Sequence, residues 1–182
     1  MEAQGEQAGT SQEARLPDTL TELQNFLRRT DTPEYDAALD EAAGIIARAE
    51  RVFLVGIGNS GSVAEYGARY LSNLGKFALG MTDPFYPITV TPNTTIAAII
   101  LSVSGETPQV LHLARQLKEK NASLIAITCS DQSTAAKLAD ITLPYYGSMH
   151  RVTSESYDLT SQMPAIYLLE SLARRVYNLL LE

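Results

Sequence analysis

The sequence predicts an α/β fold of three layers, in which helices cover both faces of a five-stranded parallel sheet with strand order 2-1-3-4-5. Apolar runs of strand length alternate with helical patterns from residue 51 onward. The runs at 52–55 and 96–101 are apolar at every position, which is typical of strands buried on both faces. Both runs lead into a turn rich in glycine and hydroxyl residues that opens a helix, as expected beside a ligand crevice.

Two helices are expected ahead of the first strand. Three leucines recur at helical spacing after Asp18, whose side chain stands where it can cap a helix. Thr32 followed by Pro33 indicates a second helix start, because proline is tolerated at the first helical position. The segment 1–16 is polar and has no apolar period, so we expect a disordered or tag-like lead-in and a single domain over 17–182.

Strands and helices then alternate through the core of the chain. The expected strands lie at 51–56, 77–81, 95–101, 123–129 and 141–145. The remaining helices are expected at 62–74, 108–120, 134–139 and 161–181. The crossover 83–94 holds three prolines, so we expect either irregular chain or one short strand over Ile88–Val90. The last helix has one apolar stripe, which predicts packing on the core or on a second subunit.

Composition disfavours several classes of protein. The formal net charge is −7 and the basic residues are scattered, which argues against direct nucleic-acid binding by this chain. The single cysteine, Cys129, excludes an internal disulfide and fits a reducing, cytoplasmic location. No apolar run reaches the ~18 to 20 residues that span a bilayer, so we expect no membrane contact. Two histidines and one cysteine show no metal-ligand spacing, and we expect no metal and no other cofactor.

Two turns concentrate the residue types that bind small anions. They are Gly56–Ser62, which reads GIGNSGS, and Ser102–Thr107, which reads SVSGET. Backbone N–H groups and hydroxyls converge where a helix begins, and the helix dipole adds partial positive charge. Neither turn contains Lys or Arg, so a phosphate there would be held by neutral donors. In the order 2-1-3-4-5 the first and third strands are neighbours, so both turns are expected to face one crevice.

The predicted contacts to a phosphosugar come mostly from these turns. They are Gly58, Asn59, Ser60, Ser102, Ser104, Gly105, Thr107 and Ser133. The serines and Thr107 supply hydroxyls, whereas the glycines let backbone N–H groups approach closely. Thr107 is also expected to begin a helix ahead of Pro108, and Ser133 to cap the short helix at 134–139. Glu106 is expected to turn away, because a carboxylate repels phosphate.

The first turn also fits a dinucleotide-binding pattern. Gly56, Gly58 and Gly61 form G-x-G-x-x-G after a strand, and Asp83 follows about 20 residues later. The remaining chain is too short for the usual six-stranded sheet with a catalytic domain, and this interpretation leaves the second turn unexplained. A P-loop is weaker still, because no Gly-Lys-Ser or Gly-Lys-Thr occurs. Dinucleotide binding therefore remains the lesser alternative.

Taken together, these motifs resemble the SIS (sugar isomerase) domain family. The glycine-rich turn ending in Ser60 and the Ser-x-Ser-Gly-Glu-Thr stretch at 102–107 carry most of the resemblance. Ala126-Ile127-Thr128 and the segment 133–140 add to it, and the similarity covers roughly 38–177. Within the family the chain looks most like the sugar-phosphate-sensing domain of RpiR-type transcriptional regulators.

The RpiR-like features are Glu155, the pair Ser161-Gln162 and the long apolar helix after them. The resemblance implies a flavodoxin-like sandwich, a phosphosugar ligand and a homodimer or homotetramer. RpiR-type regulators carry an N-terminal helix-turn-helix domain, however, and the stretch before the first strand is shorter than such a domain and has no basic recognition helix. The resemblance therefore implies a sugar sensor, either free-standing or the sensor half of a regulator, without direct DNA reading by this chain.

Sugar phosphate isomerisation is the enzymatic alternative to sensing. Moving a proton between adjacent carbons needs a base, usually a carboxylate, and a second group that handles the oxygens. Glu155 is the best candidate for the base, and His150 is a candidate second acid or base. The same residues also fit a structural role, with Glu155 capping or pairing with the last helix and His150 solvated in a loop. The residue pattern leaves both interpretations open.

Overall fold

Five parallel strands form the central sheet of the computed structural model, which describes residues 16–147, 149–152 and 157–182. The strands are β1 (Arg51–Val55), β2 (Ala78–Met81), β3 (Ile96–Leu101), β4 (Ser123–Thr128) and β5 (Ile141–Pro144). Their order is β2-β1-β3-β4-β5, and each neighbouring pair is parallel. The predicted fold class and strand order are confirmed.

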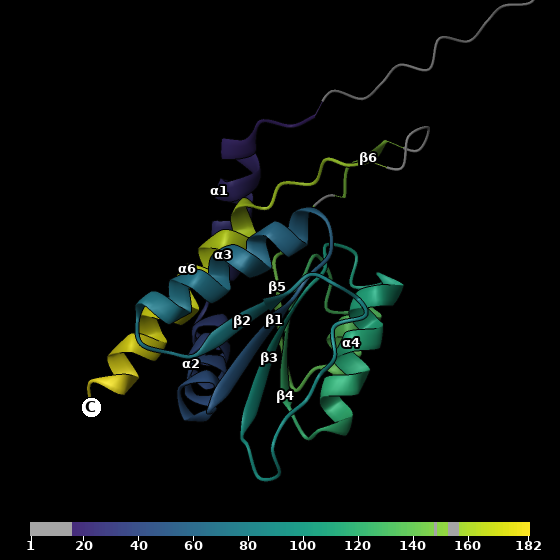
Figure 1. Ribbon diagram of the computed structural model, residues 1–182. Coiled ribbons are helices and arrows are strands. Elements are labelled where there is room, and N and C mark those ends of the chain that lie inside the picture. The colour runs from purple at the N-terminus through teal and green to yellow at the C-terminus, as the bar shows by residue number, and fades with distance from the viewer. Residues whose placement is uncertain (1–15, 148, 153–156) are drawn as a thin grey trace, which may run out of the picture.

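Helices cover both faces of this sheet (Figure 1). They are α1 (Thr19–Thr30), α2 (Pro33–Arg48), α3 (Asn59–Asn73), α4 (Pro108–Glu119), α5 (Thr134–Leu138) and α6 (Met163–Leu180). One apolar cluster joins α2, α3 and α6 to one face of the sheet. A second cluster joins α4 and α5 to the other face. The result is a three-layer, flavodoxin-like sandwich.

Strands β1 and β3 are almost entirely apolar because each contributes to both clusters. Along β1, Val52 and Leu54 lie in the cluster under α2, α3 and α6. Phe53 and Val55 point the other way and lie in the cluster under α4 and α5. The two-residue period of a strand therefore buries both sets of side chains. With both faces covered, the carboxyl edge of the sheet is the place where a ligand crevice forms.

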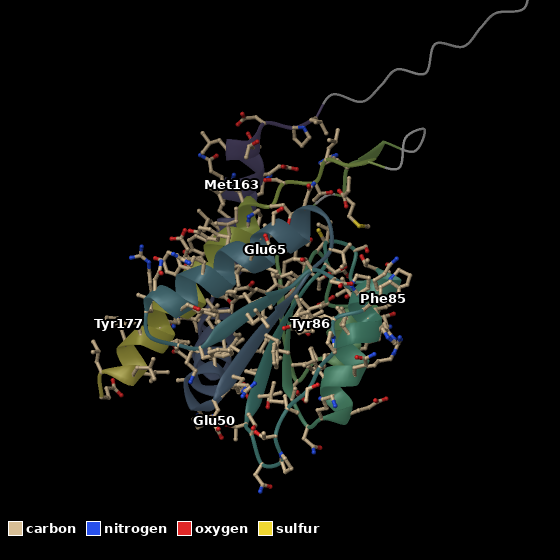
Figure 2. All side chains as sticks on the ribbon, in the orientation of Figure 1. Glu50, Glu65, Phe85, Tyr86, Met163 and Tyr177 are labelled. Atoms are coloured by element: carbon tan, nitrogen blue, oxygen red, sulfur yellow. The ribbon has the colours of Figure 1, made fainter. Side chains whose placement is uncertain are left out.

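The long helix α6 packs on the core through Leu168, Leu172 and Val176, which are fully or almost fully buried. Its other side carries Met163 and Tyr177, which are 43% and 41% exposed and lie on the outside of the molecule (Figure 2). Core packing, one of the two predicted roles of this helix, is therefore confirmed. No helix in the described ranges is both long enough and apolar enough to cross a membrane.

Three local features differ from, or narrow, the sequence prediction. Helix α3 begins at Asn59 rather than near residue 62, so residues 59–62 of the glycine-rich turn are already helical. The crossover 83–94 is irregular and the described chain forms no strand there, in keeping with its prolines. A short antiparallel hairpin of β6 (Arg151–Val152) and β7 (Tyr157–Asp158) was not predicted, because two-residue strands carry no readable period.

Candidate functional site

The turns after β1 and β3 line one open pocket at the carboxyl edge of the sheet. Its volume is about 460 Å³. The first turn contributes Gly58, Asn59 and Ser60, and the second contributes Ser104 and Thr107. Two bends separated by more than forty residues of sequence thus meet across a single space. The predicted crevice between the first and third strands is confirmed.

A third wall of the pocket consists of Asp158, Leu159 and Gln162, at the end of β7 and the start of α6. The Nδ2 of Asn59 donates a hydrogen bond to the carbonyl oxygen of Asp158, with an N···O distance of 3.2 Å. This bond links the third wall to the first turn. Sequence reasoning missed Asp158 and Leu159, and Gln162 entered only through the family resemblance.

Three helices begin at this pocket; at α3 and α4 no side chain caps the helix, whereas at α6 the Oγ of Ser161 accepts from the N–H of Met163 at 3.3 Å. The N-cap residues of α3, α4 and α6 are Gly58, Thr107 and Gln162, and none of the three caps its helix through its side chain. All three residues line the pocket. The first N–H groups of a helix have no partner within the helix, so uncapped ends present donors and partial positive charge to whatever lies in front of them. This arrangement suits an anion.

Hydroxyls of the second turn fall into two groups. Ser104 lines the pocket, and its Oγ accepts a hydrogen bond from the N–H of Glu106 at 3.1 Å. Ser102 is buried; its Oγ accepts from the N–H of Gly105 at 3.1 Å and lies 3.0 Å from the Oγ1 of Thr107. Thr107 begins α4 as predicted, but its hydroxyl pairs with Ser102 instead of capping the helix. Ser102 therefore shapes the turn from behind the pocket surface.

Two glycines are required by close packing of these turns. A Cβ on Gly56 would lie 2.3 Å from the backbone oxygen of Ser60, which no side-chain rotation relieves. Gly105 has a φ of 66°, and a Cβ there would lie 2.2 Å from the Oγ of Ser133. Both turns can approach a ligand and the neighbouring chain this closely only without side chains.

Ser133 and Glu106 serve the N-terminus of α5 rather than the pocket lining. The Oγ of Ser133 accepts from the N–H of Ala136 at 3.2 Å, so the predicted cap is confirmed, and its contact to a sugar stays a prediction. Glu106 Oε1 accepts from the N–H of Thr134 at 2.6 Å. Hydrogen bonding to Thr134 lowers the pKa of the Glu106 carboxyl. Glu106 therefore turns away from the pocket, as expected beside a phosphate.

Of the two candidate catalytic residues, only His150 is described by the structure, and it does not line the pocket. His150 Nε2 lies 3.0 Å from the Oε1 of Glu22, on α1. Glu155 lies outside the described residues, so its role stays a prediction. The ionisable side chain that does line the pocket is Asp158, whose Oδ1 accepts from the N–H of Thr160 at 2.9 Å.

Neutral donors dominate the pocket. Its described lining contains no Lys, Arg or His, in agreement with the composition of the two turns. Across the described ranges, no three His, Cys, Asp or Glu side chains are arranged to hold a metal ion. A phosphate bound here would therefore depend on hydroxyls, backbone N–H groups and helix dipoles.

The sheet differs from that of dinucleotide-binding folds with order 3-2-1-4-5-6, because β3 rather than β4 neighbours β1. Asp83 does not line the pocket. Its Oδ1 accepts from the N–H of Phe85 at 2.9 Å, closing a local turn after β2. The G-x-G-x-x-G spacing therefore occurs here without the surroundings that a dinucleotide site needs.

The family model of the SIS domain matches residues 45–173. The chain belongs to the SIS domain family. The matched region contains the whole sheet, the turns after β1 and β3, and most of α6. Helix α1 and the first part of α2 lie outside it.

Curated relatives include both regulators and isomerases. An uncharacterised HTH-type transcriptional regulator in the aarA 3'region of Providencia stuartii is 32% identical over 111 residues, covering 59% of this chain and 39% of the relative. Arabinose 5-phosphate isomerase KpsF of Escherichia coli is 32% identical over 138 residues, covering 74% and 41%. The chain spans less than two thirds of the length of these relatives.

Solved structures share the fold. The sugar isomerase domain of the RpiR transcription factor from Sphaerobacter thermophilus aligns with a TM-score of 0.67 at 22% identity, covering 86% of each chain. Vibrio vulnificus NanR complexed with ManNAc-6P aligns with a TM-score of 0.68 at 19% identity, covering 87% of this chain and 61% of NanR. An E. coli CFT073 protein in complex with a sugar phosphate aligns with a TM-score of 0.67 at 21% identity, covering 88% and 86%.

Proposed function

We propose that this chain binds a phosphorylated sugar as a regulatory SIS domain of RpiR type. The observation that carries the proposal is the meeting of the uncapped N-termini of α3 and α4 at one pocket, beside the start of α6. Two hydroxyls, those of Ser60 and Ser104, stand at the same place. Uncapped helix ends and hydroxyls together form a site for a phosphate that needs no basic side chain.

In this proposal the phosphate lies between the two turns. Ser60 and Ser104 donate their hydroxyls, and the free N–H groups in the first turns of α3 and α4 point at the phosphate oxygens; in α4 these begin at Gln109, because Pro108 has no N–H. The φ of 61° at Gly58 lets the first turn bring its backbone close. The sugar then extends toward the third wall, where Asp158 and Gln162 offer polar partners for its hydroxyls.

The relatives support this class of ligand. NanR was solved with ManNAc-6P and the E. coli CFT073 protein with another sugar phosphate, and both share the fold of this chain. The RpiR neighbour is a transcription factor and one curated relative is an HTH-type transcriptional regulator, which favours sensing. The chain would then report the presence of a sugar phosphate to another domain or protein.

The experiment that tests binding is calorimetric titration of the full chain with arabinose 5-phosphate, ManNAc-6P and glucose 6-phosphate. We expect at least one to bind, and Ser104→Ala to weaken its binding about tenfold because a hydrogen bond to a charged group is lost. Ser62→Ala is the matched control, since Ser62 is exposed on α3 and does not line the pocket. No binding of any probe, or equal losses in both variants, would contradict the proposal.

Isomerisation is the second candidate function, favoured by the carboxylate of Asp158 in the pocket and by the isomerase relatives. Glu155 remains the base predicted from sequence, and His150 remains the candidate second acid or base. Exchange of the C1 or C2 proton of a bound ketose phosphate in deuterated water measures this activity directly. If the wild type exchanges the proton and Glu155→Gln or Asp158→Asn does not, catalysis is supported. If the wild type binds the sugar phosphate without exchange, sensing is the remaining function.

Assembly and location are part of the same proposal. We expect a cytoplasmic homodimer or homotetramer that does not bind DNA through this chain. Exposed apolar side chains on the outer side of α6, among them Met163, Tyr167 and Tyr177, suit a contact with a second copy. Sedimentation of the wild type against Tyr177→Glu tests this, and a monomer at every concentration contradicts it.

A further inference from the structure

The third wall of the pocket is held from two sides. On the pocket side, Asn59 Nδ2 donates to the carbonyl oxygen of Asp158 at 3.2 Å. On the outer side, the N–H of Leu159 donates to the carbonyl oxygen of His150 at 2.8 Å. The N–H of His150 in turn donates to the Oγ1 of Thr160 at 2.9 Å. The backbone of His150 therefore fixes two consecutive residues of the chain that forms this wall.

The side chain of His150 ties the same segment to α1. Its Nε2 lies 3.0 Å from Glu22 Oε1, and the two side chains are only 24% and 19% exposed. Helix α1, which carries Glu22, is also held by a contact other than that with His150. Phe26 of α1 packs edge-to-face on Tyr167 of α6, with 5.6 Å between ring centres. A partly buried hydrogen bond to a charged group is stronger than an exposed one. Glu22 therefore supports His150 from a fixed position.

A cavity lies behind this segment. It has a volume of about 150 Å³, and its lining includes Glu22, Asn25, Thr160 and Ser161. Close-packed neighbours normally hold a chain segment in place, and a cavity removes that support on one side. The position of the wall thus depends on the hydrogen bonds of His150 more than on packing.

The structure leads us to propose that Glu22 and His150 are positioning residues for the sugar end of the pocket. Resting on the proposed function, this inference adds that docking of α1 and binding of a sugar phosphate stabilise each other through the Glu22–His150 contact. Such coupling is reciprocal by thermodynamic necessity. Helix α1, which carries Glu22, lies outside the matched region 45–173.

The two ends of the ligand make the inference testable. The phosphate is proposed to lie between the turns after β1 and β3, which do not contact the Glu22–His150 pair. Inorganic phosphate should therefore bind equally well with or without the Glu22–His150 contact. A sugar phosphate also needs the third wall and should bind about tenfold more weakly in His150→Ala and in Glu22→Ala. Glu22→Gln should lose less affinity than Glu22→Ala, because its amide oxygen accepts the same hydrogen bond without the charge.

The experiment titrates the full chain and these variants with arabinose 5-phosphate, ManNAc-6P and inorganic phosphate, the last by competition. The double variant Glu22→Ala/His150→Ala should be no weaker than either single variant, since one contact is removed in all three. His112→Ala is the matched control, because His112 is exposed on α4 and pairs with Gln116. Thermal unfolding verifies that each variant is folded.

Amide hydrogen exchange provides a second readout that a purely structural role would not move. A bound sugar phosphate should slow exchange in α1 of the wild type and leave α1 unchanged in His150→Ala. If the wild type binds neither sugar phosphate, the proposed function fails. If the wild type binds and both alanine variants keep its affinity, only the positioning role is overturned. The same holds if the alanine variants lose affinity for inorganic phosphate as much as for the sugar phosphate.

Discussion

The N-termini of α1, α2 and α5 are closed by side chains, whereas those of α3 and α4 are not. Asp18, Thr32 and Ser133 each accept a hydrogen bond from an N–H in the first turn of their helix. The two open ends both line the pocket at the carboxyl edge of the sheet. A capped end contributes to stability, while an open end keeps its donors for a ligand.

The role of a polar residue near a helix start depends on its neighbours in the fold and not on its residue type. Ser133 and Ser104 are both serines beside a helix of this sheet edge, yet one caps α5 and the other lines the pocket. Glu106, two residues from Ser104, completes the closure of α5 by accepting from Thr134. Variants that open a closed end or close an open end should therefore separate stability from binding.

The largest effect is expected from Gly56→Ala, which breaks the open end of α3. The new Cβ would meet the backbone oxygen of Ser60 at 2.3 Å, so the first turn must move. We expect the free energy of unfolding to fall by about 3 kcal/mol or more and sugar phosphate binding to disappear. Urea denaturation and calorimetric titration measure the two losses.

Gly75→Ala is the matched control for this change. Gly75 has a left-handed backbone, with a φ of 89°, which Gly56 does not, and a Cβ at Gly75 meets nothing within 4 Å. We expect a loss of about 1 kcal/mol from backbone strain and no change in binding. Equal binding losses in both variants would mean that the turn at Gly56 has no special relation to the ligand.

Closing the open end of α4 with a charge should give the next largest effect. In Thr107→Asp a carboxylate can accept from the free N–H groups of α4, which adds about 0.5 to 1 kcal/mol of stability. The same carboxylate repels a phosphate, so sugar phosphate affinity should fall at least about 100-fold. Thr107→Asn supplies a neutral cap and should lose much less affinity. Unchanged binding by Thr107→Asp would place the phosphate elsewhere.

Opening a closed end should change stability alone. Ser133→Ala removes the cap of α5, and we expect a loss of about 1 kcal/mol in the free energy of unfolding with unchanged affinity. Thr32→Ala removes the cap of α2 far from the pocket and should behave in the same way. If Ser133→Ala alone weakens sugar phosphate binding, the contact between Ser133 and the sugar predicted from sequence is real.

The smallest effect is expected at Glu106 and depends on pH. The hydrogen bond to Thr134 lowers the pKa of this carboxyl in the folded state, so its stabilisation is complete above the ordinary pKa and is lost as pH falls through the folded value. Glu106→Gln should therefore flatten the loss of stability between about pH 5 and about pH 3. Urea midpoints across that range measure it, and parallel curves for both proteins would contradict the assignment.

Local pattern was sufficient to predict the sheet and the two turns. Strands buried on both faces leave continuous apolar runs, and the strand-turn-helix units at 52–62 and 96–108 are complete within a short stretch of sequence. The order of strands then places both turns at one edge. For this reason the pocket residues Gly58, Ser60 and Ser104 could be named from sequence.

Contacts between distant segments could not be predicted in this way. The third wall depends on a bond between Asn59 and Asp158, 99 residues apart, and the hairpin that carries it has strands of two residues. The contact between His150 and Glu22 spans 128 residues. Ser102 was indistinguishable from Ser104 by type, and only burial shows that it faces Thr107 behind the turn.

The most direct test is a crystal structure of the protein soaked with the sugar phosphate that binds most tightly in the titration. We predict that the phosphate lies between Ser60 and Ser104, within hydrogen-bond distance of at least one of their hydroxyls and of the first N–H groups of α3. A phosphate found in the cavity under α1 or on the outer face of α6, with the space between the two turns empty, would contradict it.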